Sequence, residues 1–450
     1  TGYSNTALGY VTGQNNTTGT QNTALGYAAL NGNTTANNNV AVGYHSLVTN
    51  TTGSQNTAVG TNALHNNTTA AENNAFGYNA GYNVTTGTAN VMIGNSSGDA
   101  ITTGSTNVAV GIQSLSNDQT GSNNTAVGTF ALRDTTVSNN TAFGHSAGLG
   151  ISTGTNNVAV GAFALDAIGG TGNQNVAVGY DTLGDNTTGY QNVALGFESM
   201  SNNTSGGNNT AVGRSTMYQN TTGYQNVALG RQALYNNTTG NSNTCIGDLA
   251  ADSTTTGIGN VCVGHQALDK NTSGSRNTAI GQFALRDTTT SSSSVAVGYA
   301  ALMSNTGSGF NTAVGYQALT SGTSAENNTA VGFAALYSAT TGNNNTSVGA
   351  YANDSNTTGA NNVAVGRNSL GANISGNHNT AIGTNALLNN TADSSCAVGV
   401  EALEQNTSGT ENSAFGSFAV DANTTGNNNT GCGFAALGGS TTGSSNTAVG

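Results

Sequence analysis

The chain has 450 residues, of which 65 are Gly, none is Pro or Trp, and only 6% are charged. The formal net charge of −12 comes from 19 acidic and 7 basic residues, so the chain lacks the basic footprint that nucleic-acid binding needs. No run approaches the length of apolar sequence that spans a membrane as a helix, and four Cys are too few for a disulfide scaffold.

A single 17-residue repeat fills the whole chain. The unit reads N-T-A-V-G-Y-x-A-L-x-x-N-T-T-G-x-x, and the Gly that closes N-T-A-V-G occurs 27 times, from Gly9 to Gly450. Positions below are counted from this repeat glycine, so that −2 is two residues before it. Residues 1–450 therefore form one continuous array without an internal domain boundary. The chain begins and ends inside a repeat, and we expect it to be an excerpt of a longer fibre.

Three intervals between repeat glycines depart from the common length. Those that end at Gly144 and Gly399 are one residue shorter than the others, and the one that ends at Gly179 is one residue longer. A changed coil length must be absorbed somewhere, so these are candidate kinks.

The period and the composition together predict the fold class. Paired-helix repeats need about 33 residues or more, and Gly, Asn and Thr are poor helix formers. Short apolar runs bounded by Asn and Gly indicate strands and turns. The sequence thus predicts an all-β protein, a parallel β-solenoid (β-roll) of about 26 coils with two short strands and two turns in each. At about 4.8 Å per coil, it would extend about 125 Å.

The strand begins after position −4, which is Asn in 25 of 27 repeats; the exceptions are Ser294 and Ser395. Asn tolerates the left-handed turn conformation, and stacked amides can bond up and down a ladder. We expect this column to be structural.

Both faces of the strand look buried. Position −1 is apolar in all 27 repeats, and position −2 is Ala in 22. Neighbouring strand residues point to opposite faces, and a solvated face would show polar variety. We expect the large aliphatic face to fill the coil and the Ala face to meet another copy of the chain, which predicts a homo-oligomer wrapped about its long axis.

The second half of the repeat carries mainly Leu at position +4 and then N-T-T-G. Three coils have Gly at +4, namely Gly81, Gly98 and Gly148, and each has an aliphatic residue three positions later: Val84, Ile101 and Ile151. The apolar group is predicted to move along the coil, as a packed interior requires. Asn353 and Ala251 break the rule without replacement. We expect N-T-T-G to face solvent, with its Gly at positive φ.

N-T-A-V-G and N-V-A-L-G resemble the strand motif in the head repeats of trimeric autotransporter adhesins. The whole unit, as in residues 226–242 (NVALGRQALYNNTTGNS), resembles long shafts of tail-fibre-like bacterial surface proteins, which often end in an intramolecular chaperone. The resemblance covers the entire chain. It implies a left-handed β-roll, three chains side by side as a homotrimer, and a role in adhesion or as a stalk. The chain departs from the adhesin heads in its longer coil, and it contains no chaperone, anchor or neck segment.

These observations predict a structural shaft of an extracellular fibre on a bacterial cell surface, or of a phage tail fibre. The predicted partners are sister chains and a host-surface or glycan receptor. The alternatives are an ice-binding solenoid and a carbohydrate-binding one, the latter because position +1 often holds Tyr or Phe. An enzyme acting on polysaccharide would need a carboxylate cluster that the sequence lacks. We therefore predict no catalytic, cofactor-binding or metal-binding residues and no cofactor.

Several residues outside the repeat consensus are candidates for functional sites. Cys245 and Cys262 occupy position −2 in consecutive coils, close enough for a disulfide, and are interpreted as two buried thiols. Only His145 and His265 share a repeat position, and they are seven coils apart. All five His are therefore interpreted as surface substitutions: His45, His65, His145, His265 and His378. Asp is too sporadic for calcium-binding turns, and the repeated Arg-Asp pairs at 133–134 and 286–287 indicate repeat duplication.

Many N-x-T triplets match the glycan acceptor pattern. Glycosylation remains a hypothesis at four representative positions: Asn16, Asn50, Asn186 and Asn220.

Overall fold

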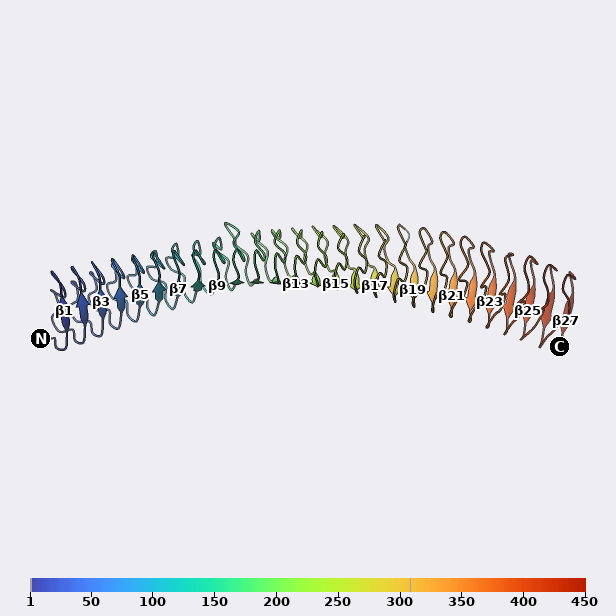
Figure 1. The fold of residues 1–450 in the computed structure, drawn as a ribbon, viewed down its shortest axis with the longest axis horizontal. Coiled ribbons are helices and arrows are strands. Elements are labelled where there is room, and N and C mark those ends of the chain that lie inside the picture. The colour runs from blue at the N-terminus through green and yellow to red at the C-terminus, as the bar shows by residue number, and fades with distance from the viewer. Residues whose placement is uncertain (1, 308) are drawn as a thin grey trace. The chain divides into compact units, whose positions relative to one another are not determined.

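The computed structural model describes residues 2–307 and 309–450, and within them it is a parallel β-solenoid with no helix. The chain divides into two compact units, residues 1–225 and 226–450, which are described separately. Figure 1 shows one short strand in each coil, with successive strands of a unit side by side.

The strands have three residues each. In the first unit they are β1 (Thr6–Leu8), β2 (Thr23–Leu25), β3 (Val40–Val42), β4 (Thr57–Val59), β5 (Asn74–Phe76), β6 (Val91–Ile93), β7 (Val108–Val110), β8 (Thr125–Val127), β9 (Thr141–Phe143), β10 (Val158–Val160), β11 (Val176–Val178), β12 (Val193–Leu195) and β13 (Thr210–Val212). In the second unit they are β14 (Val227–Leu229), β15 (Thr244–Ile246), β16 (Val261–Val263), β17 (Thr278–Ile280), β18 (Val295–Val297), β19 (Thr312–Val314), β20 (Thr329–Val331), β21 (Thr346–Val348), β22 (Val363–Val365), β23 (Thr380–Ile382), β24 (Cys396–Val398), β25 (Ser413–Phe415), β26 (Thr430–Cys432) and β27 (Thr447–Val449).

Each strand pairs with the next in parallel and in register. Ala41 of β3 lies opposite Ala58 of β4, and the same pairing recurs at every repeat of a unit for which a register is given. The predicted all-β solenoid with a 17-residue repeat is confirmed. The prediction of two strands per coil is wrong, because the second apolar segment forms turns.

The second segment cannot be a strand because its backbone alternates into the left-handed region. Ala28 at +2 has φ 55° and Leu30 at +4 has φ 52°, whereas a strand needs strongly negative φ. The N–H of Asn31 donates to the carbonyl of Ala28 at 3.3 Å, which closes a turn. Leu adopts this conformation only at a cost, which burial of its side chain offsets.

The repeat glycine itself is required by a close approach. Gly43 has φ 136°, and a Cβ there would lie 2.5 Å from the carbonyl oxygen of Gly60 in the next coil. Only Gly fits such a position without displacing the neighbouring coil.

The core of each coil is filled from positions −2 and +4. Ala41 and Ala109 at −2 and Leu47 and Leu115 at +4 have no exposed surface. The expectation that the Ala face meets another chain is therefore wrong: Ala lies inside the coil, and the larger residues at −1 point outward.

Position −2 is small because it shares its space with position +4. Met92 stands at −2 where Ala is usual, and the +4 residues of the two adjoining coils are Gly81 and Gly98. A Cβ on Gly81 would lie 2.7 Å from the sulfur of Met92, and one on Gly98 would lie 3.0 Å from its Cγ. A large residue is thus accepted at −2 only where +4 is empty.

The predicted displacement of the apolar group is confirmed. Val84 and Ile101 are fully buried and Ile151 is 5% exposed. The two exceptions also point inward, because Ala251 and Asn353 have no exposed surface.

Asn at −4 forms a ladder inside the coil wall, as predicted. The backbone N–H of Asn39 donates to Oδ1 of Asn22 in the preceding coil at 3.0 Å, and its Nδ2 donates to the carbonyl of Gly53 at 3.0 Å. The left-handed conformation does not fall on this Asn but one residue earlier, as at Asn38 with φ 58°.

A second ladder runs through the Asn of N-T-T-G. Nδ2 of Asn50 donates to Oδ1 of Asn33 at 3.1 Å and to the carbonyl of Gly53 at 2.9 Å. Both Asn50 and Gly53 are buried, and Gly53 has no positive φ, so the expectation of a solvent-facing segment with Gly at positive φ is wrong. Only the two Thr between them approach the surface.

The coils of unusual length do not interrupt the strand pairing. Thr141 still pairs with Thr125, Val176 with Val158, and Cys396 with Thr380. In the longer coil the added residue is accommodated outside the strand, around Ile168, whose side chain is 84% exposed.

Candidate functional surface

The outward face of the strands forms an extended, uncharged and largely apolar surface on each unit. It consists of positions −3 and −1, which flank the buried position −2. Position −3 is Thr in 14 repeats and Val in 10, and position −1 is apolar in all 27; neither column contains a charged residue. Leu195 and Ile280 at −1 retain 37% and 38% exposure. We call these two columns the strand face.

A ridge of aromatic rings follows the strand face at positions +1 and +2. Tyr27 lies between Tyr10 and Tyr44, with ring centres 5.6 and 5.2 Å apart and ring planes within 19° of parallel. Tyr299 and Tyr316 stack in the same way in the second unit. Each ring covers the face of its neighbour, so the stacked part of the ridge presents ring edges to solvent.

Cys245 and Cys262 lie at position −2, inside the coil, as two buried thiols. Cys245 and Cys262 are paired in register on β15 and β16, fully buried, and are free thiols, which confirms the interpretation as buried replacements of Ala. Burial, and then the neighbouring Cys245, raise the pKa of the Cys262 thiol. Cys396 and Cys432 both lie on the strand face instead, and Cys432 is exposed.

The Arg-Asp pairs are local ion pairs. Arg133 contacts Asp134 at 2.9 Å and Arg286 contacts Asp287 at 2.8 Å. The hydrogen bond from Arg133 lowers the pKa of Asp134 below its usual value. Each Arg also lies over a Phe of its own coil, so the pair is held beside the ridge.

The pKa values of several Asp carboxyls are raised, most clearly those of Asp166 and Asp252. Burial and, next, the charge of Asp181 raise the pKa of Asp166 to about 6, and burial and Asp269 do the same for Asp252. Within residues 2–307 and 309–450 no group of three or more His, Cys, Asp or Glu is placed to hold a metal ion.

The five His are not equivalent. His265 lies 3.6 Å from Asp248, which Arg231 already binds at 2.8 Å. His45 and His65, which come from different columns, have ring centres 5.8 Å apart. This contact is not visible as a shared repeat position, because the two residues are 20 positions apart, which is one repeat plus three residues.

The acceptor triplets fall on the second Asn ladder. Asn50 and Asn220 are fully buried, and their Nδ2 atoms, where a glycan would attach, donate to the preceding Asn and to a Gly carbonyl. Asn186 is 4% exposed, and Nδ2 of Asn16 donates to the carbonyl of Gly19. Attachment at these positions would break the ladder, so the geometry opposes the glycosylation hypothesis.

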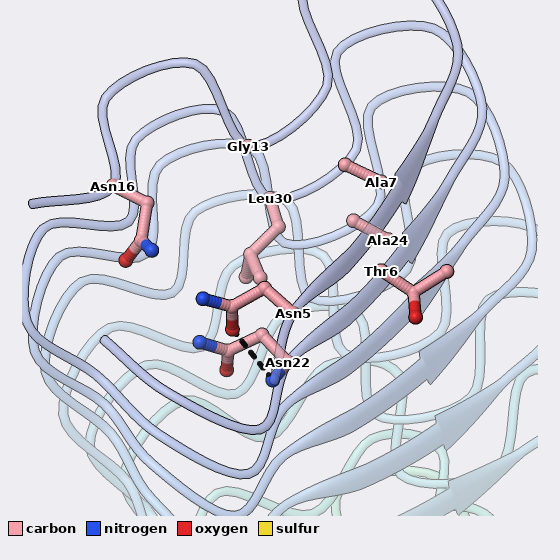
Figure 2. Close-up of a pocket in the computed structure, with 8 residues that line it drawn as sticks. All are labelled: Asn5, Thr6, Ala7, Gly13, Asn16, Asn22, Ala24 and Leu30. Carbon is pink, nitrogen blue, oxygen red and sulfur yellow. Dashed lines mark hydrogen bonds between the residues drawn. The ribbon is translucent and has the colours of Figure 1, made fainter. Parts of the chain in front are cut away.

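Two hollows lie on the first and second units. One, of about 40 Å³, opens at the first coils between Asn5, Asn22 and Leu30; Figure 2 shows the hydrogen bond that joins the two Asn beside Ala7 and Ala24. It is the coil interior seen from its edge. The other, of about 490 Å³, is an open polar notch at the shortened coil before Gly399, and Asp393 in it accepts a hydrogen bond from the N–H of Asn377.

No known protein family matches the chain, and no curated protein is significantly similar to it. In the part of the chain that the structure describes, no helix is long and apolar enough to cross a membrane.

Proposed function

We propose that the chain is the structural shaft of an extracellular fibre, on a bacterial surface or in a phage tail. In this proposal three copies, each a left-handed β-roll, pack side by side through the strand face. The observation that carries the proposal is the strand face itself: two uncharged columns, in register along each unit, that a single chain leaves half exposed.

The exposed part of the strand face is large enough to drive association. Full burial of an aliphatic side chain contributes about 1.5–3 kcal/mol, so a side chain left 37% exposed, such as Leu195, retains on the order of 0.5–1 kcal/mol. Over the coils of one unit, position −1 alone supplies on the order of 10 kcal/mol. Association costs roughly 4–15 kcal/mol, so this column matches the cost, and position −3 adds to it.

Charge favours the same face. Copies that each carry a net charge of −12 repel one another, and all 26 charged residues lie outside positions −3 and −1. Contact through the strand face brings together two columns that carry no charge. Contact through the turn that follows the repeat glycine would place Asp and Glu of different copies together.

The two alternative functions differ in how well they fit the surface. Carbohydrate binding through the stacked part of the ridge is disfavoured, because sugars stack on ring faces and the faces of Tyr27 and Tyr44 are covered by neighbouring rings. Ice binding gains one feature, because Thr at −3 shares the outward face with Val at −1. The height of that face is uneven, however, since position −1 alternates among Val, Leu, Ile and Phe. Thermal hysteresis by a single-chain species would support ice binding.

Light scattering on paired variants tests the proposal. The full chain should have three times the mass of one copy, which is 44.4 kDa. Replacing two outward residues, Val110→Lys with Val127→Lys, should reduce the mass to that of one chain. The matched control replaces two exposed turn residues of adjacent coils, Thr103→Lys with Thr120→Lys, and should leave the mass unchanged. A single-chain mass for the unmodified protein, or no effect of the Val substitutions, would contradict the proposal.

A further inference from the structure

Two His of neighbouring coils meet beside the aromatic ridge of the first unit. His45 follows β3 at position +2 and His65 follows β4 at position +5. Their ring centres are 5.8 Å apart and their planes are tilted by 55°. Tyr44 stacks on His45 at 4.0 Å and Tyr82 stacks on His65 at 4.8 Å, so both rings are held in place and only half buried.

A chain of hydrogen bonds fixes which nitrogen of His65 carries the proton. The carbonyl of Asp99 can only accept, so the amide of Asn83, 2.9 Å away, presents Nδ2 to it and Oδ1 to the preceding coil. That Oδ1 accepts from Nδ2 of Asn66 at 3.0 Å, which leaves Oδ1 of Asn66 to face Nδ1 of His65 at 2.8 Å. Nδ1 of His65 must therefore donate, and Nε2 carries the free lone pair.

The separation of the rings suits coordination of one ion. A Zn–N bond of about 2.0–2.1 Å places each ring centre about 3.2 Å from the metal, so two rings on a tetrahedral ion lie roughly 5.3 Å apart. A wider ligand angle brings the separation to the observed 5.8 Å. The hydrogen bond from Nδ1 of His65 to an amide oxygen is also the outer contact that orients metal-bound imidazoles.

We propose that His45 and His65 form a two-imidazole site for a divalent transition-metal ion of the Zn²⁺ or Cu²⁺ class, which prefers imidazole nitrogen. Water completes the coordination, because the described residues bring no third His, Cys, Asp or Glu to the pair. The ion would link two consecutive coils across their turns. This proposal does not depend on the fibre function, because both ligands belong to one chain.

Calorimetric titration of the full chain with ZnCl₂, without a polyhistidine tag, tests the site. The exposed Cys432 is a competing ligand, so every variant carries Cys432→Ser. His45→Ala and His65→Ala should each weaken the binding of one ion at least tenfold. The control is His145→Ala, whose ring packs between Phe rings with no second His, and it should change the affinity less than twofold.

A second variant separates ligation from folding. Asn66→Ala removes the acceptor of Nδ1 while both His remain, and it should weaken Zn²⁺ binding about tenfold. In nitrogen NMR spectra of the Cys432→Ser chain, Zn²⁺ should shift Nε2 of His65 and leave both nitrogens of His145 unchanged. Equal affinity in the parent and the His45→Ala and His65→Ala variants, or an Nε2 signal of His65 that Zn²⁺ does not move, would overturn the proposal.

Discussion

The Asn side chains of the coil interior should divide into two classes that respond oppositely to the same substitution. Asn353 stands at position +4 among Leu residues, is fully buried, and has no hydrogen-bond partner for either amide atom among the described residues. Asn345 in the same coil is 1% exposed, but its Oδ1 accepts the N–H of Asn362 at 3.0 Å and its Nδ2 donates to the carbonyl of Gly359 at 2.9 Å. The two residues thus match in type and burial and differ in partners.

Asn353→Leu should therefore stabilise the second unit. Leaving a buried polar group unpaired costs about 1–3 kcal/mol, and Asn353 has two such groups. Leu loses about 1 kcal/mol in the left-handed conformation that Asn tolerates, φ 52° here, but Leu336 and Leu370 adopt it in the adjacent coils. The net gain is about 1–5 kcal/mol.

Asn345→Leu should destabilise the same region by about 1–3 kcal/mol, because it leaves the buried N–H of Asn362 without a partner. The carbonyl of Gly359 loses one of its two donors and keeps Nδ2 of Asn356 at 3.0 Å. Urea unfolding of both variants, together with amide hydrogen exchange in residues 340–375, measures the two effects; exchange is needed because a repeat array need not unfold in one step. A lower stability of Asn353→Leu than of the parent would refute the reasoning, since it would mean that the amide of Asn353 is satisfied.

Three further outcomes follow from the structure. Because the pKa of Asp252 is raised to about 6, the charge of this carboxylate destabilises the folded state above that pH, and stability is regained as pH falls from 6 toward 4. Thermal unfolding should therefore show a higher midpoint at about pH 5 than at about pH 7.5. Asp252→Asn should raise the midpoint at about pH 7.5 and remove part of the difference between the two pH values. Gly43→Ala should cost at least about 2 kcal/mol in unfolding free energy because of its backbone conformation and the approach of Gly60, whereas Gly13→Ala, with φ 59° and open space, should cost about 1 kcal/mol. If copies pack parallel and in register, mild oxidation should join the exposed Cys432 of two chains by a disulfide and give a covalent dimer on a non-reducing gel. Cys432→Ser should abolish this dimer. No cross-link in the parent chain would exclude that register.

The repeat makes the fold predictable, because residues that stack on one another in successive coils occupy the same position of the 17-residue repeat. What could not be deduced from the strand alone is which of its faces lies inside. Alternation separates Ala at −2 from Val or Leu at −1, but both are apolar and either could fill a core. Two signals identify the inside: Thr at −3, which shares a face with −1 and tolerates water, and Met92 at −2 beside the empty +4 positions of Gly81 and Gly98.

The backbone conformation of the turn segments is difficult to predict from the sequence for a different reason. The residue type of Leu30 does not predict a left-handed backbone. Leu adopts that conformation only where packing against the neighbouring coils compensates for its strain. The contact between His45 and His65 was equally hidden, since it joins different positions of neighbouring coils and depends on how far each side chain reaches across the turn.

An electron cryo-microscopy reconstruction of the purified full chain tests the central claim most directly, because it shows what covers the strand face. The proposal predicts three chains in cross-section, with positions −3 and −1 of each directed at the shared axis and the Asn ladders inside each coil. A single chain with Leu195 and Ile280 in solvent, or an assembly held together through the N-T-T-G turns, would contradict it.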